Sequence, residues 1–198
     1  MTWRDIQHLC VETARVINPQ DPDWERTASG RLFSYKFGYG ALDAFAYVTA
    51  AQKWNLVKPQ AWLITNTTQL GGGKMMKKHE YEGGEPIGPN GIKNSIEITK
   101  EMMLANNLET LEHIDVRVWI NHPRRGDVMV ELVSPNNIKS ILANTREYDD
   151  ASTGFPGWRF MTVKHWSVFS TILWMPTSSK LDVGMKIPLE TGQSKCLS

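Results

Sequence analysis

The sequence has few of the residues that cross-link small proteins or bind metals. Its two cysteines, Cys10 and Cys196, stand at opposite ends of a chain of 198 residues. Two cysteines so far apart in the sequence form neither a disulfide framework nor a metal-ligand pair. The histidines are scattered singly, whereas metal ligation needs His or Cys residues at close spacing. They are His8, His79, His113, His122 and His165. We therefore expect no metal site and no cofactor site in this chain.

The sequence also lacks an excess of one charge and a long apolar run. It has 22 basic and 21 acidic residues, a net charge of +1, whereas binding to nucleic acid needs a concentrated basic face. The apolar residues of the N-terminus alternate with charges, which excludes a signal-peptide core. The cluster SVFSTILWM near the C-terminus is too short to cross a bilayer. We expect no nucleic-acid partner and no direct membrane insertion.

Residues 2–17 predict an amphipathic helix. Thr2 is a good N-cap, and Asp5 stands three residues later, where the partner of a capping box belongs. The apolar face consists of Trp3, Ile6, Leu9, Cys10, Thr13 and Ile17. A second helix is expected from residue 41 to about Trp54, with Leu42, Phe45, Ala46, Thr49 and Ala50 on one face. Two short helices cannot bury both faces against each other, so we expect a partner elsewhere.

After residue 58 the pattern changes to that of short strands. Residues 71–91 are rich in glycine and charge and predict an exposed loop. In HIDVRVWI the residues Ile114, Val116, Val118 and Ile120 alternate with polar ones, which is typical of a half-buried strand. The stretches DVMVELVSP and IKSILA continue this pattern, with Val128, Val130 and Leu132 on one face, and turns separate them. Such strands predict an antiparallel sandwich or barrel.

Four ordered motifs resemble the P domain, also called Homo B, of kexin and furin, the subtilisin-like proprotein convertases. They are NNLETLEHIDVRVWI, RRGDVMVELVSP, SILANTREYD and GFPGWRFMTVKHW. Two earlier motifs resemble the end of the same family's catalytic domain. TWRDIQHLCVETA is similar to the helix downstream of the nucleophilic serine, and SYKFGYGALDA to the closing Gly-aromatic-Gly motif. The details are most similar to fungal kexins.

The resemblance implies an α+β chain of three parts. Residues 1–57 are expected to be a helical remnant of a subtilisin-like α/β domain. Residues 58–166 are expected to form a partial P-domain sandwich, jelly-roll-like and incomplete at its C-terminus. Residues 167–198, rich in Ser, Thr, Lys and Pro, are expected to be a weakly structured tail that departs from the family. We interpret this departure as a change of reading frame near Trp166 in a chain that also starts late.

The resemblance also implies an activity, the cleavage of secretory precursors after paired basic residues, in the secretory pathway at the Golgi membrane. This chemistry uses a Ser-His-Asp triad, an oxyanion-hole asparagine, an acidic pocket and structural calcium. All three triad residues would precede Met1, so no catalytic residue is expected here. The nearest serine motif, TASG at 27–30, follows the helix that should lie downstream of the nucleophile. His113 and Asp115 on one strand would point to opposite faces.

The P domain is expected to pack its aromatic face against the missing subtilisin-like catalytic domain and stabilise it. Helix residues of the preceding segment, such as Leu42, Phe45 and Ala46, are expected to cover the central sheet of that domain. Two other functions stay open. One is a free-standing β-sandwich module that binds protein or carbohydrate. The other is an adhesion ligand that uses the Arg125-Gly126-Asp127 tripeptide. For this tripeptide we favour a structural turn in which Gly126 supplies flexibility and the flanking charges face water.

Further motifs admit both a functional and a structural interpretation. The basic pairs Arg124-Arg125 and Lys77-Lys78 are protease targets or solvated charges. His165-Trp166 is an acid-base pair or a packed strand end. The side chains of Trp158, Phe160, Met161 and Val163 are expected in the core or at a domain interface. Asn66 begins an Asn-Thr-Thr acceptor triplet for N-glycosylation, which matters in the secretory pathway.

Overall fold

The computed structural model describes most of the chain, namely residues 1–66, 74–75, 81–84, 86–88, 90–109, 111–135, 137–164 and 178–186. The residues group into two compact units. Unit 1 comprises Met1–Ile64, Thr99–Ile114 and Val163–Ser178, and unit 2 comprises Thr65–Ile98, Asp115–Thr162 and Ser179–Ser198. The N-terminal segment therefore shares a unit with two segments from much later in the sequence. The expected division near residue 58 stays a prediction.

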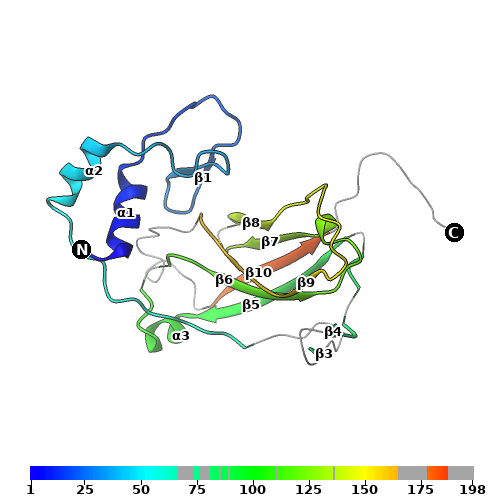
Figure 1. The fold of residues 1–198 in the computed structure, drawn as a ribbon. Coiled ribbons are helices and arrows are strands. Elements are labelled where there is room, and N and C mark those ends of the chain that lie inside the picture. Colours follow the sequence, from blue (N-terminus) through cyan, green and yellow to red (C-terminus); the bar gives the residue numbers. More distant parts are fainter. Residues whose placement is uncertain are drawn as a thin grey trace. The chain divides into compact units, whose positions relative to one another are not determined.

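Unit 1 contains the helices, coloured blue to green in Figure 1. They are α1 (Trp3–Thr13), α2 (Ala44–Ala51) and α3 (Lys100–Ala105). The short strands β1 (Glu25–Arg26) and β2 (Leu32–Phe33) pair antiparallel as a hairpin. α1 packs against α2. The predicted capping box is confirmed, because Thr2 and Asp5 bond reciprocally at the start of α1.

The first helix ends earlier than expected. After Thr13 the backbone becomes extended at Ala14, and Arg15 forms an antiparallel bridge with Ala41. The two residues exchange N–H···O bonds of 2.9 Å in both directions. A residue in such a bridge cannot continue the helical hydrogen-bond pattern, so the prediction of helix up to residue 17 is wrong for its last turn. α3 was not expected; Thr99 starts it by accepting a hydrogen bond from the amide of Met102.

Unit 2 contains two antiparallel layers that share one core. One layer is the pair β6 (Asp115–Ile120) and β9 (Phe155–Met161). The other has the order β5 (Ile92–Thr99), β10 (Ser178–Lys186), β7 (Met129–Val133) and β8 (Lys139–Ala143). A hairpin of β3 (Lys74–Met75) and β4 (Tyr81–Glu82) lies within the expected loop, the rest of which is partly outside the described residues.

The core confirms the expected alternation of β6 and β7. Both layers contribute to it, with buried Val118, Ile120, Val128, Val130, Ala143 and Phe155. Complete burial of one such side chain stabilises the fold by about 1.5–3 kcal/mol. Because these side chains come from both layers, the layers pack face to face as a sandwich. The expected α+β fold with an antiparallel sandwich is confirmed.

The expectation of a weakly structured tail does not hold for residues 178–186. These nine residues form β10, which pairs antiparallel with β7 from Asp182↔Val133 to Lys186↔Met129. In the sheet order β10 lies between β5 and β7 (Figure 1). Strand pairing satisfies backbone N–H and C=O groups whatever the side chains are, which is why poor alternation did not reveal this strand.

Candidate functional site

Asp5 joins the start of α1 to the segment that follows α2. Its carboxylate is fully buried and accepts hydrogen bonds from Thr2 at the helix start. It also accepts from the Trp54 indole at 3.0 Å and from the Val57 amide at 2.7 Å. Burial acts to raise the pKa of Asp5, but the four hydrogen bonds outweigh it and hold the pKa well below its ordinary value. The sequence pattern identified the cap but not these two distant donors.

Glu112 binds α1 from the segment just before β6. It accepts from Arg4 Nε at 2.9 Å, and His8 Nε2 lies 2.9 Å from its other oxygen. Burial acts to raise the pKa of Glu112, but hydrogen bonds from His8 and Arg4 lower it to about 2. α1 therefore turns Asp5, His8 and Leu9 inward, while Trp3 and Ile6 are exposed.

Apart from Leu9 and the partly buried Thr13, the expected apolar face of α1 thus does not match the buried one. Cys10 is exposed, and Ile17 lies beyond the helix. The inward face carries polar side chains because each of them has a charged or hydrogen-bonding partner there. Hydrophobic spacing cannot show a partner that lies more than a hundred residues away, as Glu112 does.

Lys164 binds the β1–β2 hairpin from the segment just after β9. Its side chain is only 2% exposed, and Nζ lies 2.5 Å from Glu25 Oε2. The ammonium group also lies 4.5 Å from the ring centroid of Tyr35 and 5.6 Å from that of Phe33. The two rings meet edge to face at 5.4 Å. No feature of the sequence pattern singled out Lys164.

α2 is an apolar helix that buries none of its residues. Its sequence, AFAYVTAA, has no charge. Phe45 is 83% exposed, and Leu42 and Val48 are exposed as well. Phe45 and Val48 share a helix face because they are three residues apart. The expectation that this helix needs a further partner fits these exposures. The same unit also exposes Trp62 and Ile64, in the segment after α2.

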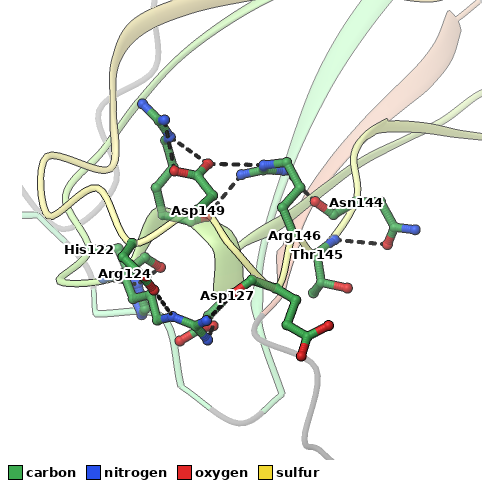
Figure 2. A network of polar contacts seen from close by, with 10 residues as sticks. His122, Arg124, Asp127, Asn144, Thr145, Arg146 and Asp149 are labelled. Carbon is green, nitrogen blue, oxygen red and sulfur yellow. Dashed lines mark hydrogen bonds and ion pairs between the residues drawn. The ribbon is translucent and has the colours of Figure 1, made fainter.

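The Arg-Gly-Asp tripeptide forms a short 3-10 helix inside a network of ion pairs. Arg125 binds both oxygens of Asp149 at 2.8 Å, and Arg146 binds the same carboxylate at 3.0 Å. Figure 2 shows Asp149 bonded to Arg146, and Asp127 paired with Arg124. The hydrogen bond from Arg125 lowers the pKa of Asp149 to about 2, against the effect of burial.

This network supports the structural turn and corrects its expected details. Arg125 does not simply face water, because its guanidinium also lies over the ring of Trp158 at 4.7 Å. Arg124 pairs with Asp127 and Asp150, so the two arginines are not merely solvated charges. Gly126 is buried, and a Cβ atom added to it would lie 2.1 Å from the Arg146 carbonyl oxygen. Glycine is needed here for close approach rather than for flexibility.

The aromatic stretch forms strand β9 but is only partly buried. Phe155 is in the core, and Phe160 packs against it. Trp158 is 42% exposed, Met161 53% and Val163 42%, so a place in the core is wrong for these three. Because successive side chains of a strand point to opposite faces, Met161 points away from the face that carries Phe160. Trp158 shares the face of Phe160 and contacts the rings of Phe155 and Phe160, with centroids 5.3 Å and 6.2 Å apart, while the rest of its side chain stays exposed.

The other candidate residues make local structural contacts or lie in different units. The Thr27 and Ser29 hydroxyls lie 2.9 Å apart, and Thr27 donates to the Arg31 carbonyl, which closes the β1–β2 turn. Asp115 pairs with Arg159 at 3.8 Å, and His113 belongs to the other unit. Among the described residues, no group of three His, Cys, Asp or Glu side chains is placed to hold a metal ion. Within the same residues, no helix has the length and apolar character needed for a bilayer crossing.

Three motifs lie partly or wholly outside the described residues. Asn66 is exposed, but the rest of its triplet lies outside the described residues. Lys77-Lys78 and His165-Trp166 lie entirely outside them. Their interpretations stay predictions.

A known protein family matches the later part of the chain. A family model described as the proprotein convertase P-domain matches residues 111–174. The match includes Glu112 and Lys164, whose side chains bind the N-terminal segment. It also continues past Trp166, where the motif resemblance in the sequence ended.

Curated relatives match most of the chain. Protease KEX1 of Kluyveromyces lactis is 37% identical over 166 residues, which cover 84% of this chain and 20% of that protein. The dibasic-processing endoprotease of Schizosaccharomyces pombe is 40% identical over 169 residues, 84% of this chain and 23% of that protein. Furin of Mus musculus is 33% identical over 170 residues, 84% and 19% respectively. The chain thus spans about a fifth of the length of these relatives.

A solved structure shares the fold. The crystal structure of a serine protease of Aeromonas sobria superposes with a TM-score of 0.63 at 17% sequence identity, over 96% of this chain and 34% of that one. At this identity the likeness concerns the fold alone.

Proposed function

Because this chain belongs to the kexin and furin family of proprotein convertases and carries their P domain, we propose that it joins the end of a subtilisin-like catalytic domain to the P domain. The enzyme of which it is a part cleaves secretory precursors after paired basic residues, in the secretory pathway at the Golgi membrane. The name of the Schizosaccharomyces pombe relative, a dibasic-processing endoprotease, supports this substrate class.

One observation carries the proposed role: α2 has neither a charge nor a buried residue. A face with Phe45 at 83% exposure and Leu42 and Val48 beside it in sequence is typical of a surface that another protein body covers. We assign the subtilisin-like catalytic domain as that body. About four fifths of each matched relative lies outside the segment that this chain covers, and the P domain belongs with such a catalytic domain in these relatives.

The experiment replaces this apolar face. The triple variant Leu42→Ser, Phe45→Ser, Val48→Ser should self-associate less than the parent chain in analytical ultracentrifugation. When the chain follows a subtilisin-like catalytic domain, the same variant should lower the melting temperature of the whole protein. The control Tyr148→Ser replaces an exposed aromatic residue of unit 2 and should do neither. An unchanged melting temperature in the fused triple variant would reject the assignment.

The 198 residues are proposed to be inactive by themselves, since no motif in them supplies the Ser-His-Asp triad. Purified chain should not hydrolyse a fluorogenic peptide with a Lys-Arg site above the buffer rate. Contaminating serine proteases are first removed by affinity purification. Hydrolysis that persists after this step and is lost in a Ser29→Ala variant would overturn the proposed inactivity. We also propose that the chain needs no calcium of its own, so its melting temperature should be the same in calcium and in EDTA.

A second candidate is a free-standing β-sandwich module that binds other proteins. The observation that favours it is the buried core of unit 2, which is built from unit 2 residues alone. Under this alternative the 198-residue chain would be monomeric and would melt in one sharp transition without a protease partner. Concentration-dependent association that the triple variant relieves would favour the first function.

A further inference from the structure

The Lys164 ammonium group is enclosed by groups from a distant part of the sequence. Nζ lies 4.5 Å from the Tyr35 ring and 5.6 Å from the Phe33 ring, and it donates to Glu25, which is 139 residues away in sequence. A buried ammonium group is costly unless it is paired. Ring faces attract cations, most strongly where water is excluded, and the carboxylate supplies the counter-charge. The hairpin thus provides a receptor for an alkylammonium group.

The neighbouring backbone supports the same contact. The Tyr39 hydroxyl donates to the carbonyl of Val163, at 3.4 Å. Phe33 in turn contacts Tyr39 edge to face, with ring centroids 5.2 Å apart. The segment that carries Lys164 is therefore bound to the hairpin region through two consecutive residues, by the Val163 carbonyl and by the Lys164 ammonium group.

We propose that Lys164 is the residue by which the P domain holds the β1–β2 hairpin of the preceding segment in its folded position. This inference rests on the proposed function, because it names the residue through which the P domain stabilises the end of the catalytic domain. Lys164 lies inside the matched P-domain segment, whereas Glu25, Phe33 and Tyr35 precede that segment.

The register of β6 and β9 places Lys164 and Glu112 at equivalent positions beyond the paired strands. Met161 of β9 pairs with Asp115 of β6. Lys164 lies three residues after Met161, and Glu112 lies three residues before Asp115. Glu112 binds Arg4 and His8 of α1. The two segments that continue from the same end of the β6–β9 pair thus each provide one charged side chain, an acid for α1 and a cation for the hairpin.

Hydrogen exchange on the full chain tests the proposal. Lys164→Met keeps an unbranched side chain, shorter by one atom, and removes its charge. The hairpin has protected amides to observe, since Thr27 donates to Arg31, and Ser34 and Gly38 donate to each other, all at 2.8 Å. We expect these amides to exchange at least about tenfold faster, while amides of β6 and β7 are unchanged. Unchanged hairpin exchange, or an equal increase throughout the chain, would overturn the proposal.

The matched control removes an exposed lysine that also binds an acid of a later segment. Lys58 pairs with Glu109 at the surface, with side chains 73% and 54% exposed, and Lys58→Met should leave hairpin exchange unchanged. If Lys164→Met does not fold, Tyr35→Leu takes its place. The partly exposed Tyr35 ring is closer to the Lys164 ammonium group than the Phe33 ring is. This variant should give the same increase confined to the hairpin, and an increase throughout the chain would again overturn the proposal.

Chemical restoration separates charge from packing. In a background with Cys10→Ser and Cys196→Ser, Lys164→Cys is alkylated with bromoethylamine, which restores an ammonium group, or with propyl iodide, which adds a neutral chain of similar length. The ammonium adduct should restore slow exchange of the hairpin amides, and the neutral adduct should not. Equal restoration by both would overturn the proposal. None of these results depends on peptide hydrolysis, so this inference and the proposed function can fail separately.

Discussion

Gly126 and Arg146 lie so close that a Cβ atom on Gly126 would stand 2.1 Å from the Arg146 carbonyl oxygen. The two residues also share a backbone hydrogen bond, in which the Arg146 amide donates to the Gly126 oxygen at 2.8 Å. The 125–127 turn and the 144–150 loop are thereby held together by backbone as well as by the arginine–aspartate pairs in Figure 2.

The first prediction concerns Gly126→Ala. Because the obstructing atoms are backbone oxygens, the turn and the loop must separate, and unfolding free energy should fall by about 3 kcal/mol or more. Urea denaturation followed by tryptophan fluorescence measures this change. Gly88→Ala is the control, since a Cβ there has nothing within 4 Å. Equal stability of the two variants would show that the turn is not packed as described.

The second prediction concerns adhesion. Asp127 accepts a hydrogen bond from Arg124 at 2.7 Å, and Arg125 is bound to Asp149. A tripeptide held in this way cannot extend into a receptor without breaking these ion pairs. Surfaces coated with the chain should therefore support no more cell attachment than surfaces coated with the Asp127→Glu variant. A clear loss of attachment in the variant would instead support the adhesion ligand.

The third prediction concerns the acid stability of unit 1. The pKa of Glu112 is about 2 in the folded chain against an ordinary value of 4.5, so folding is favoured when Glu112 is ionised. Its contribution is complete above about pH 5 and is lost as the pH falls toward 2. Allowing for screening by solvent, Glu112→Gln should cost about 2 kcal/mol at pH 7.

Thermal unfolding from pH 7 to pH 2 measures this contribution. The difference between Glu112→Gln and the parent chain should shrink steadily below pH 4.5 and be small at pH 2. Glu109→Gln removes an exposed acid that pairs with Lys58 and should behave like the parent throughout. A difference that is independent of pH would mean that Glu112 acts by packing rather than by charge.

The fourth prediction concerns Asp5. Asp5→Ala would remove the Asp5 half of the capping box of α1, while Thr2 stays as the N-cap, and it would leave the Trp54 and Val57 donors without their buried acceptor. We expect a loss of about 2–4 kcal/mol, because unsatisfied buried donors add to the loss of the capping-box hydrogen bonds. Asp43→Ala removes a simple cap, whose carboxylate accepts from Ala46 at 2.9 Å, and should cost about 1 kcal/mol. Circular dichroism during urea unfolding compares the two variants. Equal losses of stability would contradict the role of Asp5 in joining the start of α1 to Trp54 and Val57.

Local patterns were sufficient where neighbours in sequence are also neighbours in space. The capping box of Thr2 and Asp5 and the shared buried face of Val118 and Ile120 depend on spacings of two or three residues. The same patterns were wrong where a distant partner decides. Trp3 and Ile6 were expected on the inner face of α1, but Glu112 holds His8 and Arg4 on another face. Local patterns missed β10, because this strand forms by pairing with β5 and β7, which lie far from it in the sequence.

The sequence by itself determined the antiparallel character of the β module, the start of α1 and the family to which the chain belongs, since all three are written in short motifs. Only the tertiary structure decided that Glu112 and Lys164 bind the N-terminal segment and that Arg125 and Asp127 are engaged in ion pairs. The physical reason is that neither the type of a charged residue nor its neighbours in sequence identify the group with which it pairs. Where it is buried, and against what, depends on which distant segments the completed backbone brings to it.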